Sequence, residues 1–315
     1  MAFATRRRLV GGIAALACAI AAALPLTGST AHAQSGEEKD SLVVAVSQSV
    51  KSFNPFTLFF SIDFTVTGLA YDSLIDWSAK DFSPIPAIAT EWKESDDHLT
   101  WTYTIREGVK FSDGKPLTAK DVAFTYHTMM TNEDARAANA ELVDNFVSVD
   151  APDDKTFVVE LKQPSNQMLA LDTPIVPEHI WKDRLDNLGA DLNFDFPLVG
   201  SGPFQVTEFK KDQFIRFAAN KDYWGGAPKY DELVFRYFKT PDAAVQALEA
   251  GEVDVVSGLT PAQYKSLQGK DGITVNQGPG RRVHSITFNV GAQTQSGEKF
   301  GDGHPALQDV RVRRA

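Results

Sequence analysis

Histidine and cysteine, the side chains that most often hold metals or act as bases and nucleophiles, are sparse in this sequence. The chain has six histidines and a single cysteine, Cys18. The five histidines beyond residue 33 are far apart and never stand at i,i+4 spacing: His98, His127, His179, His284 and His304. A zinc site needs three or four such ligands brought together. The sequence therefore predicts no local metal site.

Motifs of enzymes are missing as well. Gly200-Ser201-Gly202-Pro203 lacks the G-x-S-x-G spacing of a hydrolase nucleophile elbow, and proline cannot continue the helix that follows such an elbow. The chain has no H-E-x-x-H, no G-x-x-x-x-G-K-[ST] and no G-x-G-x-x-G after a strand. We interpret Asp96-Asp97 and Asp153-Asp154 as turn formers rather than acid–base pairs. We expect a protein that is not an enzyme and needs no cofactor; a hydrolase with an unrecognised site is the alternative.

The first 33 residues have the features of an export signal. A basic cluster, Arg6 to Arg8, precedes an apolar run from Leu9 to Leu26, and Ala31-His32-Ala33 has the small-x-small pattern that signal peptidase cuts. We expect residues 1–33 to be a signal peptide cleaved near Ala33-Gln34. The adjacent arginines also fit a twin-arginine export route.

Two other interpretations of this segment are less favoured. A membrane-spanning helix would need an unbroken apolar stretch, whereas this run is interrupted at Pro25. A lipid anchor at Cys18 would need the run to end there, but it continues for eight residues. The mature chain would then have no cysteine, which excludes disulfides and thiolate chemistry.

Composition narrows the class of protein further. The chain has 315 residues, 43% of them hydrophobic and 23% charged, which is typical of a globular protein with real cores. Its net charge is −10, and the leader carries three arginines and no acid, so the mature chain stands at −13. Such an acidic surface is a poor binder of nucleic acid or anionic membranes. We expect an exported monomer, peripheral to the membrane.

Periodicity predicts a mixed α/β fold. Leu99 to Arg106 alternates apolar and polar residues, which is typical of a half-buried strand, and Ile88 to Trp92 would be its hairpin partner. Thr118 and Asp121 have capping-box spacing, which predicts a helix over about 118–131. Later strands alternate with helices: 233–238, then a helix that Thr240 caps and Gly251 ends, then 253–256. This order favours an α/β lobe with some parallel pairing.

Several stretches, in order along the chain, resemble one known family. They are Leu74 to Trp77, Pro84 to Trp92, Leu99 to Gly114, Leu117 to Val122, Gly200 to Phe204, Asn220 to Gly226, Leu248 to Asp254 and Pro305 to Arg314. The sequence resembles the family 5 extracellular solute-binding proteins of ABC importers, the dipeptide-, oligopeptide- and nickel-binding type. Several independent motifs in order are far more specific than any one of them.

The resemblance implies the type II periplasmic-binding-protein fold, with two lobes that close on a hinge and an inserted α+β subdomain. It divides the chain into a leader (1–33), the first part of lobe I (34–83), the insert (84–174), the rest of lobe I (175–285) and a crossover into lobe II (286–315). The family's second lobe continues well beyond such a crossover. We therefore expect this chain to be truncated within lobe II.

The resemblance also points to two places for ligand contacts. In the loop after the first strand, Phe53 and Phe56 would wall a side-chain pocket and Asn54 would pair with peptide backbone. Near the crossover, Arg281 or Arg282 would meet a carboxylate, with His284 alongside. The opposing interpretation is that the aromatic residues are core and the arginines are solvated turn residues.

The implied function is capture of a short peptide or similar small solute and its delivery to the permease subunits of an ABC importer by lobe closure. The compartment would be the periplasm or the exterior of the cell envelope. The alternatives are a nickel, haem or sugar-type solute, which the resemblance does not distinguish, and a truncated remnant that binds nothing.

Overall fold

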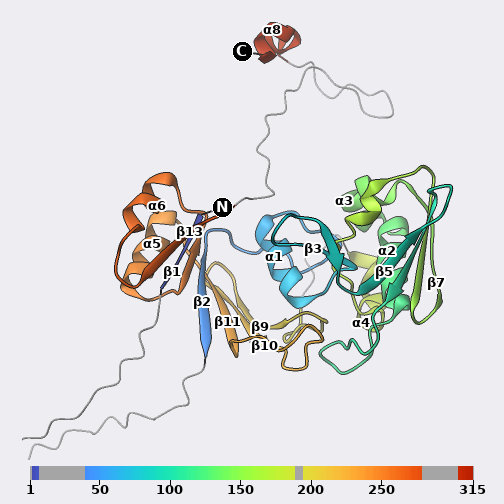
Figure 1. Ribbon diagram of the computed structural model, residues 1–315, viewed down its shortest axis with the longest axis horizontal. Helices are drawn as coiled ribbons and strands as arrows, with labels where there is room; N and C mark the ends of the chain where they lie inside the picture. Colours follow the sequence, from blue (N-terminus) through green and yellow to red (C-terminus); the bar gives the residue numbers. More distant parts are fainter. Residues whose placement is uncertain (1, 7–39, 189–193, 279–303, 315) are drawn as a thin grey trace, which may run out of the picture. The chain divides into compact units, whose positions relative to one another are not determined.

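A computed structural model describes residues 2–6, 40–188, 194–278 and 304–314 (Figure 1). Contacts group the chain into two units, 1–278 and 279–315. In the first unit the strands are β1 (Ala2–Arg6), β2 (Ser41–Val46), β3 (Ile75–Trp77), β4 (Pro84–Pro86), β5 (Ala89–Glu94), β6 (Thr100–Ile105), β7 (Phe146–Asp153), β8 (Thr156–Leu161), β9 (Phe204–Lys210), β10 (Phe214–Ala219), β11 (Glu232–Tyr237), β12 (Val255–Ser257) and β13 (Ile273–Gln277). Its α-helices are α1 (Ser61–Ala70), α2 (Ala119–Thr131), α3 (Glu133–Val143), α4 (Glu178–Trp181), α5 (Pro241–Ala250) and α6 (Pro261–Leu267).

The larger sheet has seven strands in the order β13-β1-β12-β2-β11-β10-β9. Strand β2 lies at its centre and runs parallel to both β11 and β12, as the strand–helix–strand order predicted. Side chains of β2 alternate between two cores. Leu42, Val44 and Val46 face the core that α1 covers, whereas Val43 and Ala45 face the core that α5 and α6 cover. The sheet is therefore covered on both faces, which explains the continuous apolar run of β2.

Helix α5 begins and ends where the sequence predicted. Its N-cap, Thr240, accepts a hydrogen bond from Ala243 N at 3.3 Å, and Pro241 occupies the first turn. Gly251 ends the helix in the left-handed conformation, with φ of 77°, which favours glycine. The helix returns the chain from β11 to β12, so both strands can pair in parallel with β2.

A second sheet of four antiparallel strands, β5-β6-β8-β7, lies within residues 89–161. The predicted hairpin of β5 with β6 is confirmed, and β7 pairs with β8 in a second hairpin. Helix α2 is confirmed too, with the Thr118–Asp121 capping box. Its buried Tyr126 stacks on Phe157 of β8 at 5.5 Å between ring centroids. This sheet falls inside the predicted insert, although the boundaries at 84, 174 and 285 stay predictions.

The amino-terminal residues differ from the expectation of a leader that stands apart. Residues 2–6 form β1, which pairs antiparallel with β12 and β13 in the larger sheet. Cleavage before Gln34 would remove β1, so this placement and a mature chain that begins at Gln34 exclude each other. The signal peptide, its cleavage site and the twin-arginine route stay predictions. Among the described helices, none has both the length and the apolar character to cross a membrane.

The second unit has two short described helices, α7 (Pro305–Gln308) and α8 (Val310–Arg314). Asp309 lies between them, and its Oδ1 accepts a hydrogen bond from Arg311 N at 2.8 Å. Helix α8 therefore begins directly after Asp309.

Candidate functional site

Three loops leave the larger sheet at the same edge. Strands β2, β11 and β12 run parallel, so their carboxyl ends, Val46, Tyr237 and Ser257, lie on one side. Each end is followed by a loop that leads to a helix: 47–60 to α1, 238–240 to α5 and 258–260 to α6 (Figure 1). In open α/β sheets, ligands bind just outside the carboxyl ends of the strands. We call these three loops the carboxyl edge.

The loop 47–60 is held in place by Asp63, a buried residue in the first turn of α1. Its Oδ1 accepts a hydrogen bond from Lys51 N at 3.0 Å, and its Oδ2 accepts one from Phe60 N at 3.2 Å. A carboxylate is favourable at a helix amino terminus because it faces the unpaired N–H groups there. The loop is therefore tied to α1 at two points. The neighbouring loop is tied as well, since Phe238 N donates to Val46 O at 2.9 Å.

The structure places the three predicted contacts of this loop inside the protein. Phe53, Asn54 and Phe56 are all buried. Phe53 packs edge-on against three other aromatic rings, Phe194, Phe196 and Phe209, at 5.0 to 5.8 Å between centroids. Phe56 packs against Trp181 at 5.5 Å. Asn54 Nδ2 donates to Leu188 O at 2.7 Å, and its Oδ1 accepts from Phe56 N at 3.0 Å.

These side chains attach the loop to residues 181–188 and 194–209, which favours a structural role over contact with a ligand. Their assignment as ligand contacts stays a prediction that no contact in the structure supports. Arg281, Arg282 and His284 lie outside the described residues, so their assignment also stays a prediction.

The exposed aromatic residues of this region are different ones, which the sequence analysis missed. Phe59 is 83% exposed, Phe60 41% and Phe64 55%. Helix α1 buries Ile62, Val66 and Ala70 on its inner face, so a phenylalanine at position 64 falls outside the buried stripe. A large apolar residue outside the buried stripe of an amphipathic helix was the one feature of the sequence that could have pointed to Phe64.

A buried polar network joins the seven-stranded sheet to the four-stranded sheet. Asp72 is only 7% exposed, and its Oδ1 accepts a hydrogen bond from the Tyr223 hydroxyl at 2.8 Å. Its backbone N–H donates to Ser201 Oγ at 3.0 Å. Next to Tyr223, the Trp224 ring lies 4.2 Å below the guanidinium of Arg106, which follows β6. The motifs 200–204 and 220–226 therefore form a structural joint rather than plain surface turns.

Burial is the largest influence on Asp72 and raises the pKa of its carboxyl group. Hydrogen bonds from Tyr223, Ser201 and Trp224 lower this pKa, and the nearby charge of Asp76 raises it. The net effect is a pKa above the ordinary value. Burial also raises the pKa of Tyr223, with the Asp72 charge as the second cause. The phenol therefore stays protonated and acts as a donor.

Two glycines allow this joint to form. Gly202 N donates to Ala70 O at 2.9 Å, at the end of α1. A Cβ on Gly202 would lie 2.4 Å from Leu69 O, and one on Gly200 would lie 2.0 Å from Ala70 O. No side chain fits at such distances, so the two glycines allow the backbone of residues 200–202 to pack directly against the end of α1. The motif therefore acts as a tight glycine turn, in line with its lack of the nucleophile-elbow spacing.

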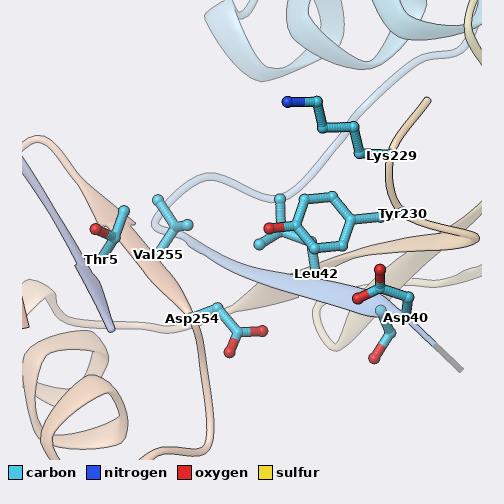
Figure 2. A pocket seen from close by; sticks show the side chains of 8 residues that line it. Thr5, Asp40, Leu42, Lys229, Tyr230, Asp254 and Val255 are labelled. Atoms are coloured by element: carbon cyan, nitrogen blue, oxygen red, sulfur yellow. The ribbon is translucent and has the colours of Figure 1, made fainter. Parts of the chain in front are cut away.

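An open hollow of about 660 Å³ lies at the opposite, amino-terminal end of β2 (Figure 2). Asp40, Tyr230 and Asp254 are among the residues that line it, together with Thr5 of β1. Asp254 has a structural task there, since its Oδ2 accepts a hydrogen bond from Val43 N at 2.9 Å and so aligns β12 with β2. One wall depends on β1, which lies in the predicted leader. We therefore favour the carboxyl edge as the functional site.

A histidine and a carboxylate are paired elsewhere in the described part of the chain. His179 Nε2 lies 2.7 Å from Asp113 Oδ2. Burial alone would raise the pKa of Asp113, but hydrogen bonds from His179 and from Lys115 N hold it below its ordinary value. Over the described ranges, no three His, Cys, Asp or Glu side chains are placed to hold a metal ion.

Comparison with known proteins identifies the family. Residues 83–315 match the model of the bacterial extracellular solute-binding proteins, family 5, middle region. An ABC transporter peptide-binding protein of Brucella ovis is 31% identical over 236 residues, which cover 71% of this chain and 44% of that protein. The chain spans about half the length of the curated relatives it matches.

Solved structures that resemble this chain are solute-binding proteins as well. The oligopeptide-binding protein AppA from Bacillus subtilis, in complex with a nonapeptide, aligns with a TM-score of 0.65 at 29% identity, over 72% of this chain and 45% of that one. The binding protein MoaA from A. tumefaciens R10, in complex with mannopinic acid, aligns with a TM-score of 0.65 at 28% identity, over 73% and 47% of the two chains.

The chain belongs to the family 5 bacterial extracellular solute-binding proteins, and its fold is that of type II periplasmic binding proteins. The expected family and fold class are both confirmed. The family consists of exported solute-binding proteins that serve ABC transporters rather than of enzymes.

Proposed function

We propose that this protein captures a short peptide or similar small solute outside the cytoplasmic membrane and delivers it to an ABC importer. The observation that carries the proposal is the carboxyl edge, where three loops converge at the ends of parallel strands in a chain of the solute-binding family. The relatives named for peptide binding support a peptide as solute.

The chemistry of the edge suits a zwitterionic or amide-rich solute. Gln48 follows β2 and Lys239 follows β11, and both side chains are exposed. A glutamine side chain offers both a donor and an acceptor to a peptide backbone, and a lysine ammonium pairs with a carboxylate. Selectivity would come from pocket shape and paired polar groups, with no covalent step.

Release and delivery would follow from lobe closure and reopening. A solute that contacts both lobes stabilises the closed state by its differential affinity for that state. The permease would recognise the closed form.

Calorimetric titration with a pool of di- to hexapeptides tests the proposal. We expect saturable heat with the unaltered chain, and a loss of affinity of about tenfold or more in the Gln48→Ala, Lys239→Ala double variant, because each lost hydrogen bond to a charged or buried group is worth about 1 kcal/mol or more.

Lys229→Ala is the matched control, since Lys229 lines the hollow at the other end of β2. If Lys229→Ala lost as much peptide affinity as the double variant is expected to lose, the result would favour the hollow as the binding site. Absence of heat with the unaltered chain would contradict a peptide solute.

A further inference from the structure

We propose that Phe59, Phe60 and Phe64 form a subsite for an apolar side chain of the solute, so that peptides with leucine, methionine or phenylalanine bind in preference to small polar ones. We call these three residues the phenylalanine patch. The inference rests on the proposed function and adds to it the chemical class of the solute.

Exposure singles out the phenylalanine patch. Among the described residues, eight large apolar side chains are exposed, and three of them fall within the six residues from Phe59 to Phe64. Of the other five, Ile85, Val147 and Tyr230 stand singly along the chain, and Val310 and Val312 lie on the short helix α8; none of these five is a phenylalanine. A single exposed apolar residue is ordinary, but a cluster of aromatic rings marks a binding surface.

The position of the patch agrees with the candidate site. Phe59 and Phe60 end the loop that leaves the carboxyl end of β2, and Phe64 follows one turn later on the outer face of α1. The inner face of the same helix is already buried against the core of the larger sheet. The rings therefore stand beside the carboxyl edge, where a solute would arrive.

The patch is uncharged, which selects an apolar partner over an ionic one. From Phe59 to Gly68 the only charged residue is Asp63, which is buried. Its carboxylate already accepts hydrogen bonds from two backbone N–H groups. The amino terminus of α1 is thus occupied by its own cap, and a solute carboxylate would meet that negative charge. A neutral apolar side chain meets no such penalty.

The patch is also held in shape before a solute binds. The rings of Phe59 and Phe60 pack edge to face at 5.2 Å between centroids. Asp63 fixes the backbone of Phe60. Aromatic side chains have few rotatable bonds, so little conformational entropy is lost when they contact a ligand.

Selectivity between two dipeptides tests the proposal. The variant Phe59→Ser, Phe64→Ser removes the two most exposed rings and leaves Phe60, whose backbone N–H is bonded to Asp63. Binding of Leu-Phe and of Gly-Ser is measured calorimetrically for the unaltered chain, for this variant and for Val147→Ser. Val147 is a matched control because it is 55% exposed on β7 of the other sheet.

We expect the unaltered chain to bind Leu-Phe at least about tenfold more tightly than Gly-Ser, because burial of one large apolar side chain is worth that much. The double variant should lose this preference while its affinity for Gly-Ser is kept, and Val147→Ser should keep both affinities.

Two results would overturn the inference alone: a preference for Leu-Phe that survives in the double variant, or equal affinity for both dipeptides in the unaltered chain. Absence of binding to either peptide would overturn the proposed peptide solute and the inference with it. A dimer of the unaltered chain that dissociates in the variant, with peptide affinities unchanged, would assign the patch to self-association and contradict the subsite.

Discussion

Replacement of Tyr223 by phenylalanine perturbs the buried joint at a single atom. The tyrosine hydroxyl donates to Asp72 Oδ1 at 2.8 Å, and phenylalanine removes that donor without changing the ring. Asp72 is almost fully buried, so water cannot replace the lost partner freely. The variant therefore leaves a buried carboxylate with one hydrogen bond fewer.

The size of the effect depends on pH, because the hydrogen bond is stronger when Asp72 is charged. A hydrogen bond to a charged group is worth about 1.5–3 kcal/mol, and one between neutral groups about 0.5–1.5 kcal/mol. We expect Tyr223→Phe to lower the free energy of unfolding by about 2 kcal/mol at pH 7 and by about 1 kcal/mol near pH 4.

The pKa of Asp72 gives the sign of the pH dependence. The folded state raises this pKa above its ordinary value of 3.8, so the folded state binds the proton more tightly than the unfolded state does. The contribution of Asp72 to stability is complete below that value and falls as pH rises through the raised pKa. Loss of the Tyr223 donor raises the pKa of Asp72 further, so the variant loses more stability on going from acid to neutral pH.

Urea unfolding followed by tryptophan fluorescence at pH 4 and pH 7 measures both quantities. Tyr230→Phe is the control, since Tyr230 is partly exposed at the hollow, and it should change stability by less than about 0.5 kcal/mol. A Tyr223→Phe effect that is equal at the two pH values, or larger at pH 4, would refute the assignment of a charged acceptor at Asp72.

Three further predictions concern the scaffold and the leader. Gly202→Ala should destabilise the folded protein by about 1–3 kcal/mol in thermal unfolding, because the new Cβ would lie 2.4 Å from Leu69 O. Gly68→Ala in α1 is the control: a Cβ there has nothing within 4 Å, so this variant should stabilise the protein by up to about 1 kcal/mol. Similar losses of stability in both variants would contradict the close packing at Gly202. Thr118→Ala should lower the free energy of unfolding in urea by about 1 kcal/mol, because the capping box of α2 is lost. Thr131→Ala is the control, since the Thr131 hydroxyl donates to His127 O within the same helix, and it should lower the free energy by less than half as much. A larger loss for Thr131→Ala than for Thr118→Ala would disprove the role of the cap. Amino-terminal sequencing of the exported protein should begin at Gln34, and a start at Met1 or Ala2 would show that β1 is retained.

Local signals in the sequence predicted the elements well. Thr240 and Gly251 predicted the ends of α5, and the alternation from Leu99 to Arg106 predicted β6, because caps and period-two patterns act within a few residues. The family motifs predicted the fold class, since their order along the chain carries long-range information that no single motif has.

Contacts between distant residues were beyond the sequence pattern. Asp72 and Tyr223 are 151 positions apart, and nothing near either one signals the other. The predicted ligand residues Phe53, Asn54 and Phe56 are buried because aromatic and amide side chains serve cores and turns as readily as binding sites. We propose the exposed rings of Phe59 and Phe64 as contacts instead, and the only sign of them in the sequence was the position of Phe64 outside the buried stripe of α1.

Hydrogen–deuterium exchange with and without a bound peptide tests the central claim, that solute binds at the carboxyl edge. We predict slower exchange in residues 47–60, 238–240 and 258–260 when peptide is present, with little change around Asp40 and Tyr230. Protection confined to the hollow at the amino-terminal end of β2, with the three loops unchanged, would contradict the claim.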